Sequence, residues 1–370
     1  LRGGGQTYIL NLLDNMSAME INVLLLINTK NNAVFSNYKS VQVNSYEAAW
    51  ASKSILHRVF WEIFCLPIKL NSWHATVYYA PGGIMITKVP KGCLSATALQ
   101  NMLPFDVRER KRFPFFSYIR FKLWLLRYVF LISYKLSDKV VFISEYSRSV
   151  IEQYIPDIGK KSIVIPHGLN SDFLNTADFY DLPDFLKETP FYLYVSILDV
   201  YKAQKEVIQS WKLLADRDFP YPLVLVGPKY NQYGEEVIAL IDELGLSKKV
   251  IYLGAVAYEK LPGLYKSARA LIFASSCECC PNILLEKLAA GKSVLCSNIE
   301  PMPEFGADAV VYFDPYNKLD LVEKIIDLEK YPNKMNELAD KAHAQAMKFD
   351  WKSTTERTVR FLLNNKSIEG

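Results

Sequence analysis

Histidine and cysteine are scarce in this chain, which leaves little material for a metal site or a disulfide framework. Its 370 residues include four histidines and six cysteines. Three cysteines crowd together as Cys277, Cys279 and Cys280, but no second pair stands at zinc-ligand spacing and no histidine is near. Zinc sites need ligands at defined spacing, and disulfide frameworks are typical of small secreted chains. We therefore expect free thiols and no bound metal.

Long apolar runs are also missing. No uncharged stretch approaches the roughly 18 apolar residues that cross a bilayer. Residues 21–27 are too short for the core of a signal peptide, and they fit a strand better. Internal repeats and low-complexity segments are absent as well. We expect a cytoplasmic protein, with room for peripheral attachment to the inner face of the membrane.

Charge of one sign is not in large excess. The chain holds 43 Lys and Arg against 39 Asp and Glu, a formal net charge of +4, which gives no indication of a nucleic-acid partner. Half of the residues are hydrophobic and 13% are aromatic, so large cores can form and global disorder is excluded. The length exceeds that of a usual single core and favours two domains.

The second half of the chain alternates short apolar strands with amphipathic helices. This pattern is typical of βαβ units around a parallel sheet that is buried on both faces. The expected strands are residues 191–197, 223–226, 250–253, 270–274 and 293–297. The expected helices are residues 203–215, 235–244 and 282–290, with a shorter one from Pro262.

The first half repeats this scheme less cleanly. Its expected strands are residues 23–27, 40–43, 76–79, 140–143 and 163–165, and a long helical region covers residues 46–70. We predict an α/β protein with an N-terminal Rossmann-like domain over residues 1–180 and a C-terminal one over residues 181–348. Residues 166–190 connect them, and a last helix in residues 349–370 packs back on the first domain.

The chain opens on a glycine run instead of a strand. Gly3, Gly4 and Gly5 come first, whereas a Rossmann domain places a strand before such a loop. We therefore expect the first strand to precede Leu1.

Residues 275–286 carry the clearest chemical signal. A strand ends before them, a loop carries Glu278, and Pro281 stands where the first helical residue should be. The first amides of that helix would be unpaired donors able to hold a diphosphate, and they belong to Asn282, Ile283 and Leu284. Glu286, in the first turns, could hydrogen-bond a ribose diol, and Glu278 could reach a sugar. A surface loop before an acidic helix start is the alternative, because the helix dipole also favours acids there.

With two glutamates eight positions apart in this setting, the chain resembles the retaining glycosyltransferases of the two-domain GT-B architecture, family 4 (group 1). The resemblance covers residues 191–351 and includes further short runs. These runs are residues 223–227, 250–254, 289–291, 303–304 and 313–315. The resemblance implies two facing, doubly wound Rossmann-like domains and a cleft between them. It also implies transfer of a hexose-type sugar from a nucleoside-diphosphate-sugar to a glycan or lipid-linked acceptor, in the synthesis of a surface polysaccharide or glycolipid.

The resemblance also implies roles for individual residues. Glu286 would bind the nucleotide ribose, Glu278 the donor sugar, and Lys202 would neutralise the diphosphate, which makes Glu278 and Lys202 the catalytic candidates. Val256 would lie beside the base. The glycine run, with Gly4 near the donor and Gln6 near the acceptor, resembles the loop that approaches the phosphate. No Asp-x-Asp motif stands at a strand end, so we expect chemistry without a metal ion or another cofactor.

Three positions depart from the family pattern. Ile197 stands where an arginine usually supplies a second cation to the diphosphate. Gln100 and Asn101 replace a pair of histidine and acid on the acceptor side, so they can position hydroxyls but cannot act as a general base. His167 stands where asparagine is usual, and we interpret it as a structural histidine.

Residues 108–135 combine positive charge with aromatic side chains. Eight Lys or Arg residues are interspersed with nine aromatic residues, and Glu109 is the one acid among them. Such a segment suits the surface of an anionic membrane. In the alternative interpretation, Leu123, Leu126 and Phe130 belong to the core and the cations are merely solvated. Single-stranded nucleic acid would use similar residues, but no other feature supports it.

Two other functions stay open at this point. A nucleotide-sugar epimerase can share the two facing domains, but it needs acid and base residues, and Gln100 and Asn101 argue against them. A non-catalytic homologue that only binds a nucleotide-sugar is the second alternative. Ile197 favours it, whereas Lys202, Glu278 and Glu286 argue for catalysis.

Overall fold

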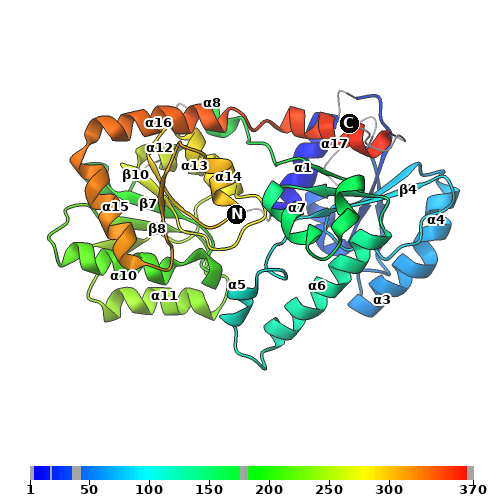
Figure 1. The fold of residues 1–370 in the computed structure, drawn as a ribbon, viewed down its shortest axis with the longest axis horizontal. Helices are drawn as coiled ribbons and strands as arrows, with labels where there is room; N and C mark the ends of the chain where they lie inside the picture. Colours follow the sequence, from blue (N-terminus) through cyan, green and yellow to red (C-terminus); the bar gives the residue numbers. More distant parts are fainter. Residues whose placement is uncertain (1–3, 17–18, 36–42, 176–179, 181, 365–370) are drawn as a thin grey trace.

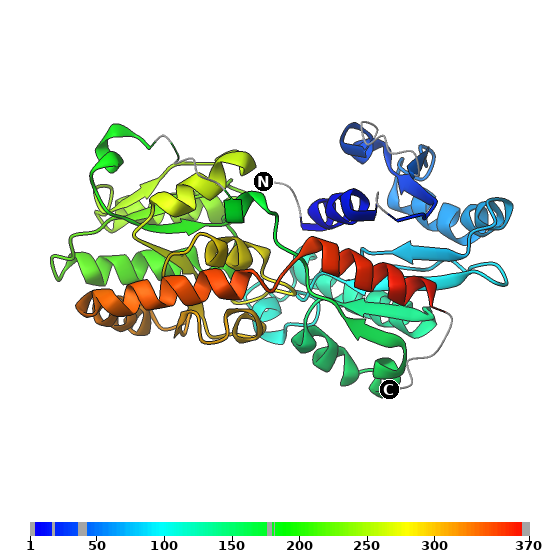
Figure 2. The same cartoon turned by 90° about the horizontal axis from the view of Figure 1, so that it is seen from above.

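The structure is a computed structural model of the chain. It describes residues 4–16, 19–35, 43–175, 180 and 182–364 (Figure 1). Parallel sheets lie in two halves of an elongated molecule, and helices cover both (Figures 1 and 2). The α/β fold predicted from the sequence is confirmed.

A six-stranded parallel sheet forms the second half. Its strands are β7 (Tyr192–Val195), β8 (Leu223–Val226), β9 (Val250–Tyr252), β10 (Ala270–Phe273), β11 (Val294–Ser297) and β12 (Val311–Phe313). Their order in the sheet is β12-β11-β10-β7-β8-β9. The direction in which the chain adds strands therefore reverses between β7 and β10, as in a doubly wound sheet. Ligands bind outside the carboxyl ends of the strands at such a reversal.

Alternate residues of each strand serve opposite faces of this sheet. Tyr192 and Tyr194 of β7 pack on one face, which also buries Met335 and Leu338 and side chains from three further helices. These helices are α10 (Gln204–Ala215), α11 (Gln232–Glu243) and α15 (Lys318–Lys330). Leu193 and Val195 pack on the other face. That face is covered by α12 (Leu261–Ser267), α13 (Asn282–Ala289), α14 (Met302–Gly306) and α16 (Pro332–Ala346).

The first half holds a four-stranded parallel sheet, ordered β3-β4-β5-β6. Its strands are β3 (Val77–Ala80), β4 (Leu94–Leu99), β5 (Lys139–Phe142) and β6 (Ser162–Val164). The sequence did not predict β4, because Thr97 is its one β-branched residue and it has no aromatic side chain. A separate parallel pair joins β1 (Val23–Ile27) to β2 (Val43–Glu47), and the strand predicted at 40–43 lies mostly outside the described residues.

The helical region predicted for residues 46–70 begins later than expected. Residues 43–47 belong to β2, and helix α3 (Ile55–Phe60) starts only at a capping serine, Ser54. A π-helical turn (Trp61–Cys65) then joins α3 to α4 (Leu66–Ser72). The remaining helices of this half are α1 (Gly4–Met16), α2 (Asn32–Phe35), α5 (Val107–Lys111), α6 (Tyr118–Leu136) and α7 (Glu145–Glu152). Short helices α8 (Asp172–Asn175) and α9 (Asp184–Lys187) lie in the connection to the second half.

The last helix, α17 (Trp351–Leu363), returns to the first half of the molecule (Figures 1 and 2). Trp351 packs with Tyr8 of α1, and Phe361 packs against Val141 of β5. A glycine is required where this crossing begins, because a Cβ atom on Gly168 would lie 2.2 Å from the backbone nitrogen of Trp351. The crossing therefore ties the connection after β6 to the start of α17.

No helix in the part of the chain that the structure describes is both long and apolar enough to span a membrane.

Candidate functional site

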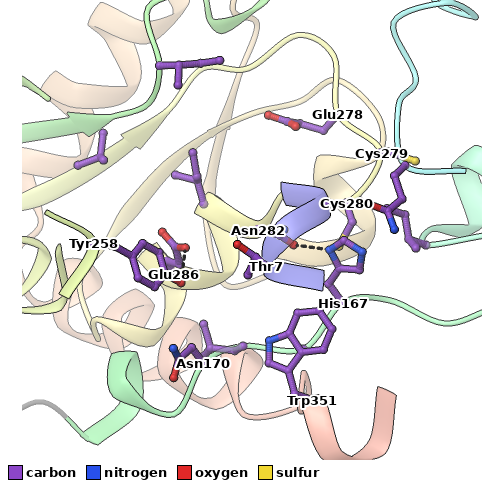
Figure 3. Close-up of a pocket in the computed structure, with 18 of the residues that line it drawn as sticks. Thr7, His167, Asn170, Tyr258, Glu278, Cys279, Cys280, Asn282, Glu286 and Trp351 are labelled. Carbon is purple, nitrogen blue, oxygen red and sulfur yellow. Dashed lines mark hydrogen bonds between the residues drawn. The ribbon is translucent and has the colours of Figure 1, made fainter. Parts of the chain in front are cut away.

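A cavity of about 510 Å³ opens between the two halves at the carboxyl ends of β7 and β10 (Figure 3). This is the point where the strand order reverses. Its size suits a small organic ligand, since such pockets usually measure about 300 to 1,000 Å³. The lining comes from both halves, with Gly5, Thr7, Gln100 and Trp351 from the first half and its crossing helix, and Lys202, Tyr258, Glu278, Ile283 and Glu286 from the second.

Lys202 and Glu278 form an ion pair beside the cavity. Lys202 ends a 3₁₀ helix (Val200–Lys202) that follows β7, and Glu278 lies in the loop after β10. The lysine side chain is 6% exposed and the glutamate side chain 16%, so each charge needs the other. The amide of Ser276 donates to the carbonyl oxygen of Tyr201 over 2.8 Å. This hydrogen bond joins the turn that carries Lys202 to the loop that carries Glu278, next to the ion pair.

Glu286 faces the same cavity from α13 (Figure 3). Its two carboxylate oxygens each accept one hydrogen bond of 3.2 Å, from the hydroxyls of Tyr258 and Tyr265. Burial raises the pKa of Glu286 to about 7, which the neighbouring Lys287 and the two tyrosines only partly offset. A half-ionised carboxylate at neutral pH, with both oxygens at a cavity wall, can accept hydrogen bonds from a diol.

The start of α13 differs from the sequence expectation. The amide of Asn282 donates to the carbonyl oxygen of Cys280 over 3.0 Å, and that of Leu284 donates to Pro281 over 2.8 Å. Among these three amides, only that of Ile283 makes no backbone hydrogen bond within the described residues. The prediction of three unpaired amides is therefore wrong, because Pro281 sits at the cap position and its carbonyl closes a tight first turn. One free amide remains at the cavity.

His167 joins three parts of the molecule. Its Nδ1 atom lies 3.0 Å from Oδ1 of Asn282, and its ring stacks between Tyr8 and Trp351, with ring centroids 4.9 and 5.4 Å away. An amide oxygen only accepts, so Nδ1 carries the proton. Nε2 is then an acceptor, and it is buried without a partner in the described residues. Burial lowers the pKa of His167 to about 4, so the ring is neutral at pH 7.

Gln100 follows β4 and lines the cavity from the first half. Its Nε2 atom is buried and has no hydrogen-bond partner among the described residues, which leaves a donor for a ligand hydroxyl. Asn101 does not line the cavity. It is exposed, and its side chain accepts a hydrogen bond of 3.1 Å from the amide of Leu103.

Four other predicted residues lie outside the cavity lining. Gly4 is the first residue of α1, so this part of the glycine run is the first turn of a helix and not a loop, and Gly5 lines the cavity in its place. Gln6 donates to Asn31 over 3.4 Å. Val256 and Leu284 are packed in the core at 7% and 0% exposure. Their apolar side chains are better satisfied there than at a polar ligand.

Lys287 is a buried cation that the sequence did not single out. It is fully buried, donates to the carbonyl oxygen of Val195 over 2.9 Å, and lies over the rings of three aromatic residues. Burial lowers the pKa of Lys287, and the adjacent Glu286 opposes this shift. A lysine directly after a predicted ligand residue in an otherwise apolar helix was the available signal.

Glu304 is a second residue whose role was missed. It belongs to α14 of the second half, yet its carboxylate accepts hydrogen bonds of 2.8 and 3.2 Å from the amides of Glu145 and Tyr146 at the start of α7. An acid at a helix N-terminus is stabilising, so Glu304 holds the two halves together beside the cavity.

Three of the buried thiols lie in the loop after β10, and Cys279 and Cys280 line the cavity. Burial raises the pKa of Cys280, so it is an unreactive thiol at neutral pH. Within the described ranges, no three side chains of His, Cys, Asp or Glu come together in a way that could hold a metal ion.

The fold matches solved glycosyltransferase structures over nearly the whole chain. A glycosyltransferase from Rickettsia africae ESF-5 aligns with a TM-score of 0.73 at 16% identity, covering 98% of this chain and 96% of that one. Alr3699/HepE of Anabaena in complex with UDP and glucose gives 0.70 at 17% identity, with 97% and 96% covered. WaaG, a glycosyltransferase involved in lipopolysaccharide biosynthesis, gives 0.71 at 13% identity, with 99% and 97% covered. The architecture is therefore GT-B.

Sequence comparison identifies a family domain in the second half of the chain. The family model described as Glycosyl transferases group 1 matches residues 183–345. The O-antigen chain mannosyltransferase B of Escherichia coli is 28% identical over 227 residues, which cover 60% of this chain and 59% of that protein. Residues 183–345 therefore carry a domain of the glycosyl transferases group 1 family, as the sequence predicts for this half, within a fold shared with solved glycosyltransferases.

Proposed function

We propose that the chain is a retaining family 4 glycosyltransferase that moves a hexose-type sugar from a nucleoside-diphosphate-sugar to a glycan or lipid-linked acceptor. The observation that carries this proposal is the cavity at the strand reversal, with Glu286 and the free amide of Ile283 on one side and the Lys202–Glu278 pair on the other. The ribose would lie against Glu286 and the diphosphate near Ile283 and Lys202. The sugar would then lie within reach of Glu278.

The chemistry follows from where charge develops. Breaking the anomeric bond leaves positive charge on the sugar and an additional negative charge on the diphosphate. Lys202 and the Ile283 amide would stabilise the diphosphate, and the carboxylate of Glu278 would face the sugar. The buried Nε2 donor of Gln100 would orient a hydroxyl from the acceptor side. No side chain in this scheme acts as a general base, so the leaving phosphate oxygen would accept the acceptor proton on the same face.

We infer a role in surface polysaccharide or glycolipid synthesis from the relatives. The mannosyltransferase relative acts on an O-antigen chain by its name, and WaaG is involved in lipopolysaccharide biosynthesis. Nucleoside-diphosphate mannose is the first donor to test, and UDP-glucose the second, since HepE has been solved with UDP and glucose. A nucleoside-diphosphate-sugar panel, scored by thermal stabilisation, should give one clear donor, because a ligand raises stability in proportion to its saturation.

Product analysis tests the reaction itself. With donor and acceptor present, the proton spectrum of the product should show the anomeric configuration of the donor, and added EDTA should leave the rate unchanged. An epimerase would instead convert the donor sugar without acceptor, and a non-catalytic homologue would bind donor without turnover. Inversion of the anomeric centre, or loss of activity with EDTA, would refute the retaining or the metal-independent part of the proposal.

We also propose that the surface of α5 and α6 contacts an anionic membrane from the cytoplasmic side. The buried face of α6 includes Leu123 and Phe130, while Phe115 and Phe116 before it are 70% and 95% exposed. A hollow of about 550 Å³ lies between the helices, lined by Val107, Arg110, Lys111, Phe115, Phe116, Ser117, Arg120, Phe121 and Trp124. Cations beside exposed aromatics suit a headgroup region.

Vesicle flotation tests this contact. The protein should float with vesicles that contain phosphatidylglycerol and should not float with pure phosphatidylcholine. Replacing Phe115 and Phe116 with serine should abolish flotation. Binding to both kinds of vesicle alike, or to neither, would contradict an anionic membrane partner.

A further inference from the structure

The one acid of the basic segment, Glu109, is buried between the two halves of the molecule. It belongs to α5 of the first half and is 1% exposed. Its Oε1 atom accepts hydrogen bonds from the hydroxyls of Ser276, over 2.8 Å, and Tyr316, over 2.5 Å, both from the second half. A buried carboxylate is costly unless it is paired, so these contacts specify how α5 meets the second half.

Ser276 connects this carboxylate to the loop after β10. It stands two residues before Glu278, and its amide donates to the carbonyl oxygen of Tyr201, the residue before Lys202. Glu109 therefore touches the loop at the residue that joins the two turns on which the Lys202–Glu278 pair is built. Glu109 itself does not line the cavity.

Further charges hold Glu109 in place. Arg112 stands at the C-cap of α5. Its Nη1 atom lies 3.6 Å from Oε2 of Glu109, and its Nη2 atom lies 2.8 Å from Oε1 of Glu206 in α10. The guanidinium of Arg108 lies 4.9 Å from the ring centroid of Tyr316. The carboxylate is thus fixed by contacts on both sides, and the donor from Ser276 is the one that leads toward the cavity.

We infer that Glu109 is a positioning residue that holds the loop carrying Glu278 in register with Lys202 when the two halves meet. This inference rests on the proposed function, because it concerns the same site. Glu286 and Ile283 lie on α13 and make no contact with Glu109, so nucleotide binding does not depend on it. Placement of the sugar does depend on Glu109, because the loop that Glu109 holds fixes the position of the Glu278 carboxylate. The α5–α6 surface and the donor loop are then mechanically connected.

Hydrogen exchange tests whether Glu109 holds the loop after β10 in place, and it needs no sugar transfer. The variant Glu109→Gln keeps the shape but weakens the charged hydrogen bond, and Ser276→Ala removes it from the other side. In both variants the amides of residues 275–281 should exchange about tenfold faster than in the wild type, while those of α13 stay unchanged. Glu304→Gln is the matched control, because it weakens another contact between the halves, at the start of α7, without changing the hydrogen bonds of Glu109 or Ser276. Unchanged exchange at 275–281 in both variants would overturn the inference.

Transfer kinetics with the identified donor then test whether the position of the loop matters for sugar transfer. Both variants should lower kcat for transfer about tenfold, and the nucleoside diphosphate should bind within about twofold of the wild type. The share of donor hydrolysed instead of transferred should rise. The double variant should be no worse than either single one, because both remove the same contact. Equal losses in nucleotide binding and transfer, or losses that multiply in the double variant, would contradict a positioning role. Failure of the wild type to transfer sugar would refute the proposed function. The exchange result would then still decide whether Glu109 positions residues 275–281.

Discussion

Lys202 and Glu278 form their ion pair from two different turns of the second half, one after β7 and one after β10. These are the two strands between which the strand order reverses. The fold therefore brings a cation and an anion to the one place where a doubly wound sheet leaves a crevice. Because the pair is assembled within the protein, its two side chains need little ordering when a charged ligand arrives.

Substitution of either member of this pair should lower transfer, and it should also lower stability because the other buried charge loses its partner. In Lys202→Met the leaving diphosphate loses its cation, and in Glu278→Gln the sugar loses a charged partner. We expect kcat for transfer to fall by roughly 100-fold or more in each, the size seen for lost transition-state contacts. Lys212→Met is the control, because Lys212 pairs with Asp216 on the outer surface. Initial rates decide, and a Lys202→Met enzyme with normal kcat would exclude the assigned role.

Removal of the Glu286 carboxylate should weaken nucleotide binding. Two charged hydrogen bonds to a ribose diol would be lost in Glu286→Ala, so we expect the dissociation constant of the nucleoside diphosphate to rise roughly 30-fold, or about 2 kcal/mol. Glu259→Ala provides a control, since Glu259 is exposed and does not line the cavity. Calorimetric titration measures both. An unchanged constant for Glu286→Ala would remove Glu286 from the ligand site.

Nucleotide affinity should depend on pH around neutrality. Burial raises the pKa of Glu286 to about 7, so the carboxylate is protonated below that pH and accepts hydrogen bonds less well. The dissociation constant should therefore rise by up to about tenfold for each pH unit below 7. Lys287, whose pKa is also lowered by burial, gains charge over the same range and would favour an anion instead. Binding titrations between roughly pH 5 and 9 distinguish the two effects. The loss of nucleotide affinity at low pH should disappear in Glu286→Gln and persist in Lys287→Met.

Glu286 should also lower the free energy of unfolding of the protein at neutral and alkaline pH. Its pKa rises from 4.5 in an exposed setting to about 7 in the folded chain. Below 4.5 it is protonated in both states and costs nothing; the cost grows as the pH rises from 4.5 to about 7 and is fully present above that. Glu286→Gln should therefore increase the free energy of unfolding at alkaline pH by roughly 1 to 3 kcal/mol. Urea unfolding at alkaline and acidic pH checks this, and a variant that is less stable at both would show that the carboxylate is well paired.

Much of the second half could be predicted from the sequence. Its strands are continuous apolar runs, and each helix between them is amphipathic, so the periodicity alone places them. Helix α17 lies at Trp351–Leu363, within the residues 349–370 where the sequence predicts the last helix. The pair of glutamates could be recognised because both lie next to a strand end and a proline that starts a helix.

Other features could not be read from the chain. Strand β4 is built from small and polar residues that only their tertiary neighbours make strand-like. The amides of Asn282 and Leu284 are satisfied by carbonyls of a tight turn, whose geometry the residue types leave open. Glu109 and Glu304 act across the boundary between the halves, and contacts between distant segments leave no local pattern.

A crystal structure of the protein with bound nucleoside diphosphate tests the account most directly. The account predicts the diphosphate within hydrogen-bond distance of the Ile283 amide and Lys202, with the ribose hydroxyls on the carboxylate of Glu286. A nucleotide bound elsewhere, or one whose ribose makes no contact with Glu286, would contradict it.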